Sequence, residues 1–431
     1  MHNDIADTSS TDPVPGDDRP AHTHDVPDLR VFVFVLFFVF GGITSLNDIL
    51  IPKLKDLFTL SHAQAMLVQS AFFAAYFLVS LPAAFMVRRI GYLRTAALGV
   101  LIMALGCLLF IPAARIGVFG VFLGALFVLA AGITTVQVVA NPLISMLGKP
   151  RTAHSRLTFA QAFNSLGTTL FPYAGALLIL APLAGVSASS LSGAALAAYR
   201  QQEAAIVGQT YMGLALALLI LAALIWLRRH RLPTPPSAAR TTGHALQLLS
   251  RPRFGLGAAC IFLYVGAEVA IGSLLVAYLM QPSTLGLAEQ AAGTHVPFYW
   301  GGALIGRFIG AWLLQRVSPG KVLTGVACAA ISLLIISVTS QGAVSAWTLL
   351  AIGLCNSIMF PTIFSLASEG LGHRAAEGSG IICMAIVGGA IIPPLTGHLA
   401  DLFDLRLALL LPAVCYALIG AYGAYARRPA I

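Results

Sequence analysis

TTVQVVANPL, residues 134–143, places two amides, Gln137 and Asn141, and a proline, Pro142, inside a long run of apolar residues. Polar side chains in such a run are costly unless they face a cavity or a polar partner. Proline removes one backbone hydrogen bond of a helix and often breaks it. The stretch therefore predicts an interrupted, largely buried helix that carries part of a polar site.

The composition around this stretch is that of a membrane protein. Of the 431 residues, 58% are hydrophobic and 10% are charged, whereas a soluble globular protein carries about 25% charged residues. Apolar runs recur with roughly the twenty residues that a helix needs to cross a bilayer. The runs are continuous and do not alternate with polar residues, which favours helices over a closed barrel. We therefore predict an all-α membrane protein.

The apolar runs predict twelve transmembrane helices in two six-helix halves. The first half is residues 31–228 and the second is 255–427, joined by a basic, proline-rich cytoplasmic linker at 229–254. Residues 1–30 are polar and are expected to form a disordered cytoplasmic tail. The expected spans are 31–50, 64–87, 95–114, 118–147, 158–181, 209–228, 255–280, 294–315, 321–340, 346–369, 378–399 and 405–426.

The positive charges predict the orientation, because loops on the cytoplasmic side are enriched in Lys and Arg. With the N-terminus inside, the loops and tail on that side hold most of these residues, and the outside loops hold only Lys53, Lys55, Arg115, Arg200 and Arg406. We expect both termini in the cytoplasm and the chain in a bacterial-type inner (plasma) membrane. The net charge of +9 then reflects orientation, and no binding of nucleic acid is expected.

The two halves resemble each other. NPLISMLGKP closes the fourth span and FPTIFSLASEGLG closes the tenth, so that Pro142 and Pro361 each precede a short apolar stretch and a basic loop. A parallel repeat of six spans is the architecture of the major facilitator transporters. Broken helices at matching places in the halves would point to a central binding site.

Amide side chains form stripes on two expected spans. Gln137 and Asn141 are four residues apart, and Gln161 and Asn164 are three apart, so each pair lies on one helix face. An amide both donates and accepts hydrogen bonds, which suits a neutral polyhydroxylated molecule. Hydrogen bonds that hold the helices together are the alternative use of these side chains.

Two carboxylates are candidates for the coupled ion. Asp48 lies near the end of the first span, and Glu268 lies among apolar residues of the seventh. A carboxylate in a dry environment takes up a proton more readily, which suits proton coupling. Glu268 is also a candidate for a substrate hydroxyl. The alternatives are ion pairs: Asp48 with the lysines that follow it, and Glu268 with Arg307.

No motif of an enzyme is present. The chain lacks a Walker loop, an HExxH motif, a CxxC pair and a GxSxG elbow. Its six cysteines lie in apolar runs, so neither a disulfide nor a metal site is expected. We predict no enzymatic activity and no cofactor; the expected partners are a small-molecule sugar and the lipid bilayer, and the expected state is a monomer.

Motifs spread over residues 30–425 resemble the fucose–proton symporter family of the major facilitator superfamily. They are SLNDILIPKLKDLF, QSAFFAAYFLVSLPA, VVANPLISMLG, RLTFAQAFNSLGTT, FLYVGAEVAIGS, YWGGALIGRFIG, NSIMFPTIFSLASEGLG and GSGIICMAIVGGAIIPPLTG. The resemblance implies a sugar transporter, with Asp48 in proton coupling and Asn164 in sugar binding; Asn47, beside Asp48, joins the expected substrate site.

Two positions depart from related patterns. The fucose branch has a glutamate where this chain has Gln137, so the second carboxylate of that coupling is missing, and the pattern looks like the glucose/galactose branch. Arg88 stands where most facilitators have an aspartate. A glutamine at 137 is equally compatible with sodium coupling or with an uncoupled facilitator.

The resulting prediction is import of a glucose- or galactose-type hexose by proton symport with alternating access. Sodium-coupled or uncoupled transport of fucose or N-acetylglucosamine is the alternative. A drug exporter of the same fold would be expected to show an apolar cavity with acidic groups in place of an amide cluster. A membrane sensor would need a soluble signalling domain, for which neither tail nor linker is long enough.

Overall fold

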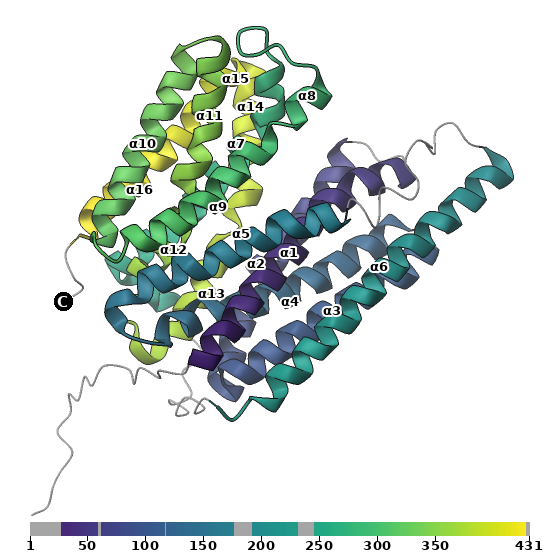
Figure 1. The fold of residues 1–431 in the computed structure, drawn as a ribbon, viewed down its shortest axis with the longest axis horizontal. Helices are drawn as coiled ribbons and strands as arrows, with labels where there is room; N and C mark the ends of the chain where they lie inside the picture. Colours follow the sequence, from purple (N-terminus) through teal and green to yellow (C-terminus); the bar gives the residue numbers. More distant parts are fainter. Residues whose placement is uncertain (1–26, 59–61, 117, 176–191, 232–244, 428–431) are drawn as a thin grey trace, which may run out of the picture.

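The computed structural model describes residues 27–58, 62–116, 118–175, 192–231 and 245–427 (Figure 1). Side chains are not described at positions 47–58 and 62–68 or at a few single positions. Most of the expected tail at 1–30 and of the expected linker at 229–254 lies outside the described residues, so both stay predictions.

Residues of the first half form six long helices because their apolar runs leave no other way to satisfy the backbone in lipid. They are α1 (Pro27–Phe58), α2 (His62–Ile90), α3 (Tyr92–Ile116), α4 (Phe119–Met146), α5 (Ala153–Gly175) and α6 (Gly193–Leu227). Helix α3 packs against α4 and α6, and α1 packs against α5. The sixth helix begins well before the expected start at 209, because the polar residues that precede the apolar run are also helical.

The second half contains six spans, three of which are divided into two helices. The undivided ones are α7 (Pro252–Met280), α9 (Val296–Leu313) and α10 (Pro319–Thr339), and a short α8 (Glu289–Gly293) precedes α9. The divided spans are α11 with α12 (Gly342–Asn356, Met359–Ser368), α13 with α14 (Ala375–Ala385, Gly388–Leu402) and α15 with α16 (Leu405–Ala408, Leu410–Tyr425).

The predicted fold class is confirmed. Ten segments of the described chain are long and apolar enough to span a membrane. Helices α5 and α9 are not among these ten, and they occupy the fifth and eighth of the twelve expected spans. Gln161 and Ser165 of α5 and Arg307 of α9 are polar residues of these two helices, and together with the ten segments α5 and α9 make up the twelve expected spans.

The expected break at Pro142 is wrong. Helix α4 continues through Pro142 to Met146, while the matching span of the second half is interrupted at residues 357–358, before Pro361. A proline can stay inside a membrane helix when another group satisfies the carbonyl that it leaves without a donor. For Pro142 this carbonyl belongs to Val138, and a side chain of the other half provides the donor, as described below.

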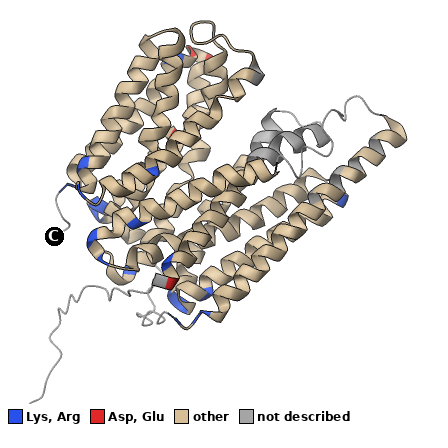
Figure 2. Ribbon diagram, viewed as in Figure 1, with Lys and Arg blue, Asp and Glu red and all other residues tan. Residues whose placement is uncertain are grey.

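Positive charge gathers at one end of the molecule (Figure 2). This end, here called the basic end, carries the start of α1, the end of α16 and the turns that follow α2, α4, α9 and α12. Gly148 and Gly370 adopt positive φ in matching turns after α4 and α12, where glycine alone avoids a steric penalty. The charge distribution is the asymmetry that the sequence predicts.

Glycines allow close approach of helices within the second half. A Cβ placed on Gly388, the first residue of α14, would lie 2.0 Å from the backbone oxygen of Phe262 in α7. The backbones therefore meet without a side chain between them, as is common where membrane helices pack. At Gly325, on the exposed side of α10, an added Cβ would meet no atom within 4 Å.

We expect Gly388→Ala to lower the apparent melting temperature of the detergent-purified protein, because the added methyl group forces α7 and α14 apart. Gly325→Ala is the matched control and should leave the melting temperature unchanged or raise it, since alanine favours a helix by about 0.5–1 kcal/mol. Equal melting temperatures for the two variants would contradict the close packing at Gly388.

Candidate functional site

The two halves meet along a seam formed by two groups of helices. Helix α13 packs against α2 and α4, and α5 packs against α9 and α12. The amide stripes predicted from the sequence lie on α4 and α5, which are both seam helices. The seam is therefore the place where side chains from the two halves can act on one molecule.

On the first half, the amide of Gln137 is held by a tyrosine. The Tyr76 hydroxyl of α2 donates to Gln137 Oε1 at 2.8 Å, and both side chains are buried. Because the amide oxygen is occupied, the Gln137 nitrogen is oriented as a donor. On α5, Gln161 is buried and Asn164 donates to the Phe37 backbone oxygen at 3.3 Å.

Among the described residues, no hydrogen bond accounts for the burial of the Asn141 side chain. It is fully buried in α4, one turn beyond Gln137, and neither Nδ2 nor Oδ1 has a hydrogen-bond partner among the described residues. A buried amide without partners costs roughly 1–3 kcal/mol for each unsatisfied group. An amide kept at this cost is suited to a water molecule or a ligand hydroxyl that enters the seam.

On the second half, a carboxylate lies in a network of tyrosines and an amide. The Tyr264 hydroxyl donates to Glu268 Oε1 at 2.7 Å, within one turn of α7. Asn356 of α11 donates to the Tyr299 hydroxyl at 2.7 Å, and Tyr299 donates to the Glu268 backbone oxygen at 3.2 Å. The network fixes Glu268 near the middle of α7, and no ion pair of Glu268 occurs within the described ranges.

Arg307, inside α9, connects the two halves. Its Nη1 donates to the Gln161 backbone oxygen at 3.0 Å and to the Ser165 hydroxyl of α5. Its Nε donates to the Ser357 backbone oxygen at 3.2 Å. This last carbonyl lacks its usual helical donor because Pro361, four residues later, has no N–H. Arg307 thus provides the donor for the Ser357 carbonyl at the break in the second half, and it also donates to the first half.

The matching carbonyl of the first half is satisfied in the same way. Pro142 leaves the Val138 backbone oxygen without its helical donor. The Ser379 hydroxyl of α13, in the other half, donates to this oxygen at 2.8 Å and is fully buried. The hydrogen bond joins the halves next to Gln137, and it explains how α4 remains continuous.

Ion pairs close the seam at the basic end. Glu377 of α13 pairs with Arg88 of α2 and, at 2.8 Å, with Arg374. Arg88 is the residue that departs from the usual facilitator pattern. Its partner in this ion pair, Glu377, belongs to the opposite half.

A second set of contacts closes the seam between α5 and α12. His154 Nε2 lies 3.1 Å from Glu369 Oε1, and His154 Nδ1 lies 2.5 Å from the Ser365 hydroxyl. Glu369 also pairs with Arg253 at the start of α7. The described structure is thus the state in which the basic end is closed.

The structure describes the side chains of five predicted site residues but not those of Asn47 and Asp48. Gln137, Asn141, Gln161 and Asn164 lie on α4 and α5, and Glu268 lies across the seam on α7. The side chains of Asn47 and Asp48 lie outside the described residues, so their roles stay predictions. The roles of all these residues in binding or coupling also stay predictions.

Sequence patterns gave no signal for several residues that complete the site. Tyr76 and Tyr299 resemble ordinary aromatic residues of a span, and Ser379 resembles a small packing residue. Glu369 and Glu377 lie at span ends, where charges are common. Their partners lie on distant helices, so no spacing within one span could reveal them.

The comparisons with known proteins agree with this architecture. The family model described as Major Facilitator Superfamily matches residues 33–386. The chain belongs to the Major Facilitator Superfamily. As a member of this superfamily it is a multi-pass membrane protein, and its fold places the seam between two six-helix halves.

Relatives narrow the family further. The chain is 50% identical over 392 residues to a glucose/galactose transporter of Brucella abortus biovar 1 (strain 9-941), covering 90% of this chain and 92% of the relative. It is 36% identical over 417 residues to the L-fucose-proton symporter of Escherichia coli (strain K12), covering 92% of each. These relatives confirm the predicted resemblance and show a transporter family, in agreement with the expectation of no enzymatic activity.

Solved structures of one relative match the whole fold. A crystal structure of the E. coli fucose:proton symporter superposes with a TM-score of 0.85 at 32% identity, covering 94% of this chain and 100% of that one. Another, described as the outward conformation, has the same TM-score at 33% identity and covers 93% and 99% of the two chains.

The hydrogen bond between Ser379 and Val138 can be tested with a double-mutant cycle. We expect Ser379→Ala to cost about 1–3 kcal/mol of thermal stability, because it leaves the buried Val138 carbonyl without a donor. In a Pro142→Ala background the restored N–H of residue 142 satisfies this carbonyl, so the cost of Ser379→Ala should shrink. The same cost in both backgrounds would show that the hydroxyl does not compensate for the proline.

The closed basic end gives a second prediction. Glu369→Gln removes the charge that binds His154 and Arg253, so we expect a several-fold shift toward a state open at this end, where tenfold corresponds to about 1.4 kcal/mol. Spin labels at residues 151 and 318, in a chain with Cys328→Ser, measure the separation of the halves. Asp401→Asn, at the exposed opposite end, is the control and should leave the distance distribution unchanged.

Proposed function

We propose that the chain imports a hexose of the glucose/galactose type across a bacterial inner membrane by proton symport. The relative with 50% identity is named for glucose and galactose, and another relative is named as a proton symporter. The observation that carries the proposal is the presence of buried polar groups on both halves, with amides on α4 and α5 of the first and Glu268 with its tyrosines on the second.

Sugar binding is assigned to amides because a hexose presents hydroxyls that both donate and accept. Gln137, with its oxygen bound by Tyr76, donates through its nitrogen, and Asn141 has both amide groups without partners in the described structure. Gln161, Asn164 and Asn47 extend this set along α5 and α1. Glu268 accepts a sugar hydroxyl from the opposite half.

Proton coupling is assigned to Asp48 and Glu268. Gln137 cannot take up a proton, so the first half offers no carboxylate at that position. Among residues whose side chains are described, Glu268 is a carboxylate in the middle of α7, in the second half. Its hydrogen bond from Tyr264 responds to whether it carries a proton.

The basic end is assigned to the cytoplasm, with both termini on that side, because cytoplasmic loops of membrane proteins are rich in Lys and Arg. The protein is proposed to act as a monomer, since one chain supplies both halves of the site. Sugar and proton enter from the opposite end while the ion pairs of Glu369 and Glu377 keep the basic end closed. Import then requires that these contacts and the Ser379 hydrogen bond break together.

Uptake into proteoliposomes tests the function. We expect an inward proton gradient to accumulate radiolabelled glucose or galactose, and a sodium gradient alone to have no effect. Glu268→Gln should abolish accumulation driven by the proton gradient while sugar exchange at equal pH continues, because the amide binds a hydroxyl but carries no proton. Asp401→Asn, which neutralises an exposed carboxylate at the end opposite the basic end, is the control and should retain accumulation.

The outcomes separate the alternatives. Accumulation driven by sodium alone would replace protons by sodium as the coupled ion, and equilibration without accumulation would indicate an uncoupled facilitator. Uptake of fucose or N-acetylglucosamine but not of glucose or galactose would overturn the assigned substrate. Efflux of a lipophilic dye without any sugar uptake would favour the exporter.

A further inference from the structure

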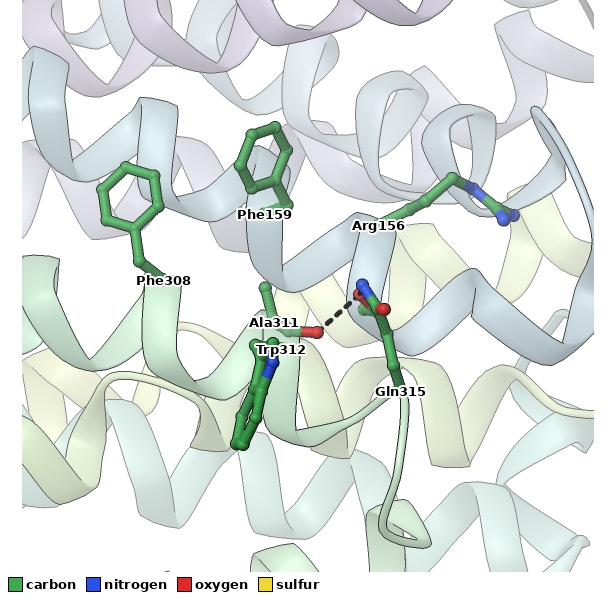
Figure 3. A pocket seen from close by; sticks show the side chains of 7 residues that line it. Arg156, Phe159, Phe308, Ala311, Trp312 and Gln315 are labelled. Atoms are coloured by element: carbon green, nitrogen blue, oxygen red, sulfur yellow. Dashed lines mark hydrogen bonds between the residues drawn. The ribbon is translucent and has the colours of Figure 1, made fainter.

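A groove of about 390 Å³ lies between α5 and α9, near the basic end (Figure 3). Ser155, Arg156 and Phe159 line it from α5, while residues of α9 and the turn after it line the other side. The latter are Phe308, Ala311, Trp312 and Gln315. Because α5 belongs to the first half and α9 to the second, the groove exists only where the two halves pack together.

The groove opens toward lipid and not toward the polar site. Phe308 and Trp312 are about half exposed although both are apolar, as are Ile305 and Ile309 on the same face of α9. Arg307, which reaches the seam, is on the opposite face of this helix. An exposed apolar stripe on a membrane helix is the surface that contacts acyl chains.

The walls of the groove suit an apolar chain. Phe159 and Phe308 meet edge to face, with their ring centroids 6.0 Å apart. The polar groups at its base are already satisfied: Ser155 donates to the Ala311 backbone oxygen at 2.6 Å, and Gln315 donates to Ser155 Oγ at 3.2 Å. A chain lying there therefore leaves no polar group without a partner.

The mouth of the groove carries a cation at the depth of a lipid headgroup. Arg316 follows the last turn of α9, is exposed, and places its guanidinium 4.0 Å from the centroid of the Trp312 ring. Tryptophan and arginine at the end of a membrane helix lie at the interface between lipid and water. Arginine binds phosphate through several donors, and this end of the molecule is rich in positive charge.

We infer that the groove binds one acyl chain of an anionic glycerophospholipid, whose phosphate contacts Arg316. The apolar walls favour an acyl chain, and the Arg316 guanidinium favours a negatively charged headgroup. Because the groove lies near the basic end, the lipid comes from the bilayer leaflet at that end. The inference does not depend on which sugar or ion is transported. Since both halves build the groove, the bound lipid stabilises the state in which the basic end is closed.

Trp312 supplies a direct reporter, because a brominated acyl chain quenches the fluorescence of a tryptophan that it contacts. The chain has four tryptophans, so Trp312 is retained alone by changing Trp226, Trp300 and Trp347 to Phe. The protein is placed in vesicles of phosphatidylcholine with increasing fractions of brominated phosphatidylglycerol. A parallel series uses brominated phosphatidylcholine.

Trp226 is a matched control. It lies in the last turn of α6, is about half exposed, and has Arg229 over its ring at 4.8 Å. It therefore has the same neighbouring cation at the same end of the molecule, but it does not line the groove. A second variant retains Trp226 alone and reports on ordinary boundary lipid beside an arginine.

We expect quenching of Trp312 to show a several-fold preference for brominated phosphatidylglycerol over brominated phosphatidylcholine, and Trp226 to show little preference. Arg316→Gln should reduce the preference at Trp312 to that at Trp226. Equal preference at the two tryptophans would overturn the site, and a preference that persists in Arg316→Gln would overturn the assigned headgroup contact. Adding Glu369→Gln, which opens the basic end, should weaken the preference; an unchanged value would overturn the link to the closed state.

Discussion

The contact between the two halves depends on how two backbone carbonyls are satisfied where Pro142 and Pro361 remove their usual helical donors. A membrane interior offers no water to such a group, so each freed carbonyl needs a donor from the protein. Pro142 frees the carbonyl of Val138, which receives the Ser379 hydroxyl. Pro361 frees that of Ser357, which receives the Arg307 guanidinium. The donors to these two carbonyls, Ser379 and Arg307, both contribute to the contact between the halves.

The side chains that satisfy these two carbonyls therefore also join the two halves of the transporter. The Ser379 hydrogen bond crosses the seam, and Arg307 reaches across it to α5 while it holds the Ser357 carbonyl. When the halves separate at the basic end, the seam fills with water, which can satisfy the Val138 carbonyl in place of Ser379. The contacts can therefore be lost without leaving unsatisfied groups in a dry environment, and the two states can lie close in free energy.

Much of the fold could be predicted from the sequence because twelve apolar runs leave little choice of structure. The amide stripes on α4 and α5 were also predictable, since residues three or four apart share a helix face. The continuity of α4 through Pro142 was not, because it depends on Ser379, more than two hundred residues away along the chain. The early start of α6 was missed for a different reason: the polar stretch RQQE, residues 200–203, ends the apolar run in the sequence, yet the helix continues through it.

The two sides of the seam differ in chemistry, and this difference bears on coupling. Among the described site residues, the first half presents neutral amides, whereas the second presents Glu268 and Arg307. Arg307 donates hydrogen bonds to neutral acceptors, which include a backbone oxygen of α5. Glu268 accepts a hydrogen bond from the Tyr264 hydroxyl. In the proposed proton symport, a proton on Glu268 would change the charge of the second half while the amides of the first half stay neutral, so the coupled ion would act on the contacts between the halves.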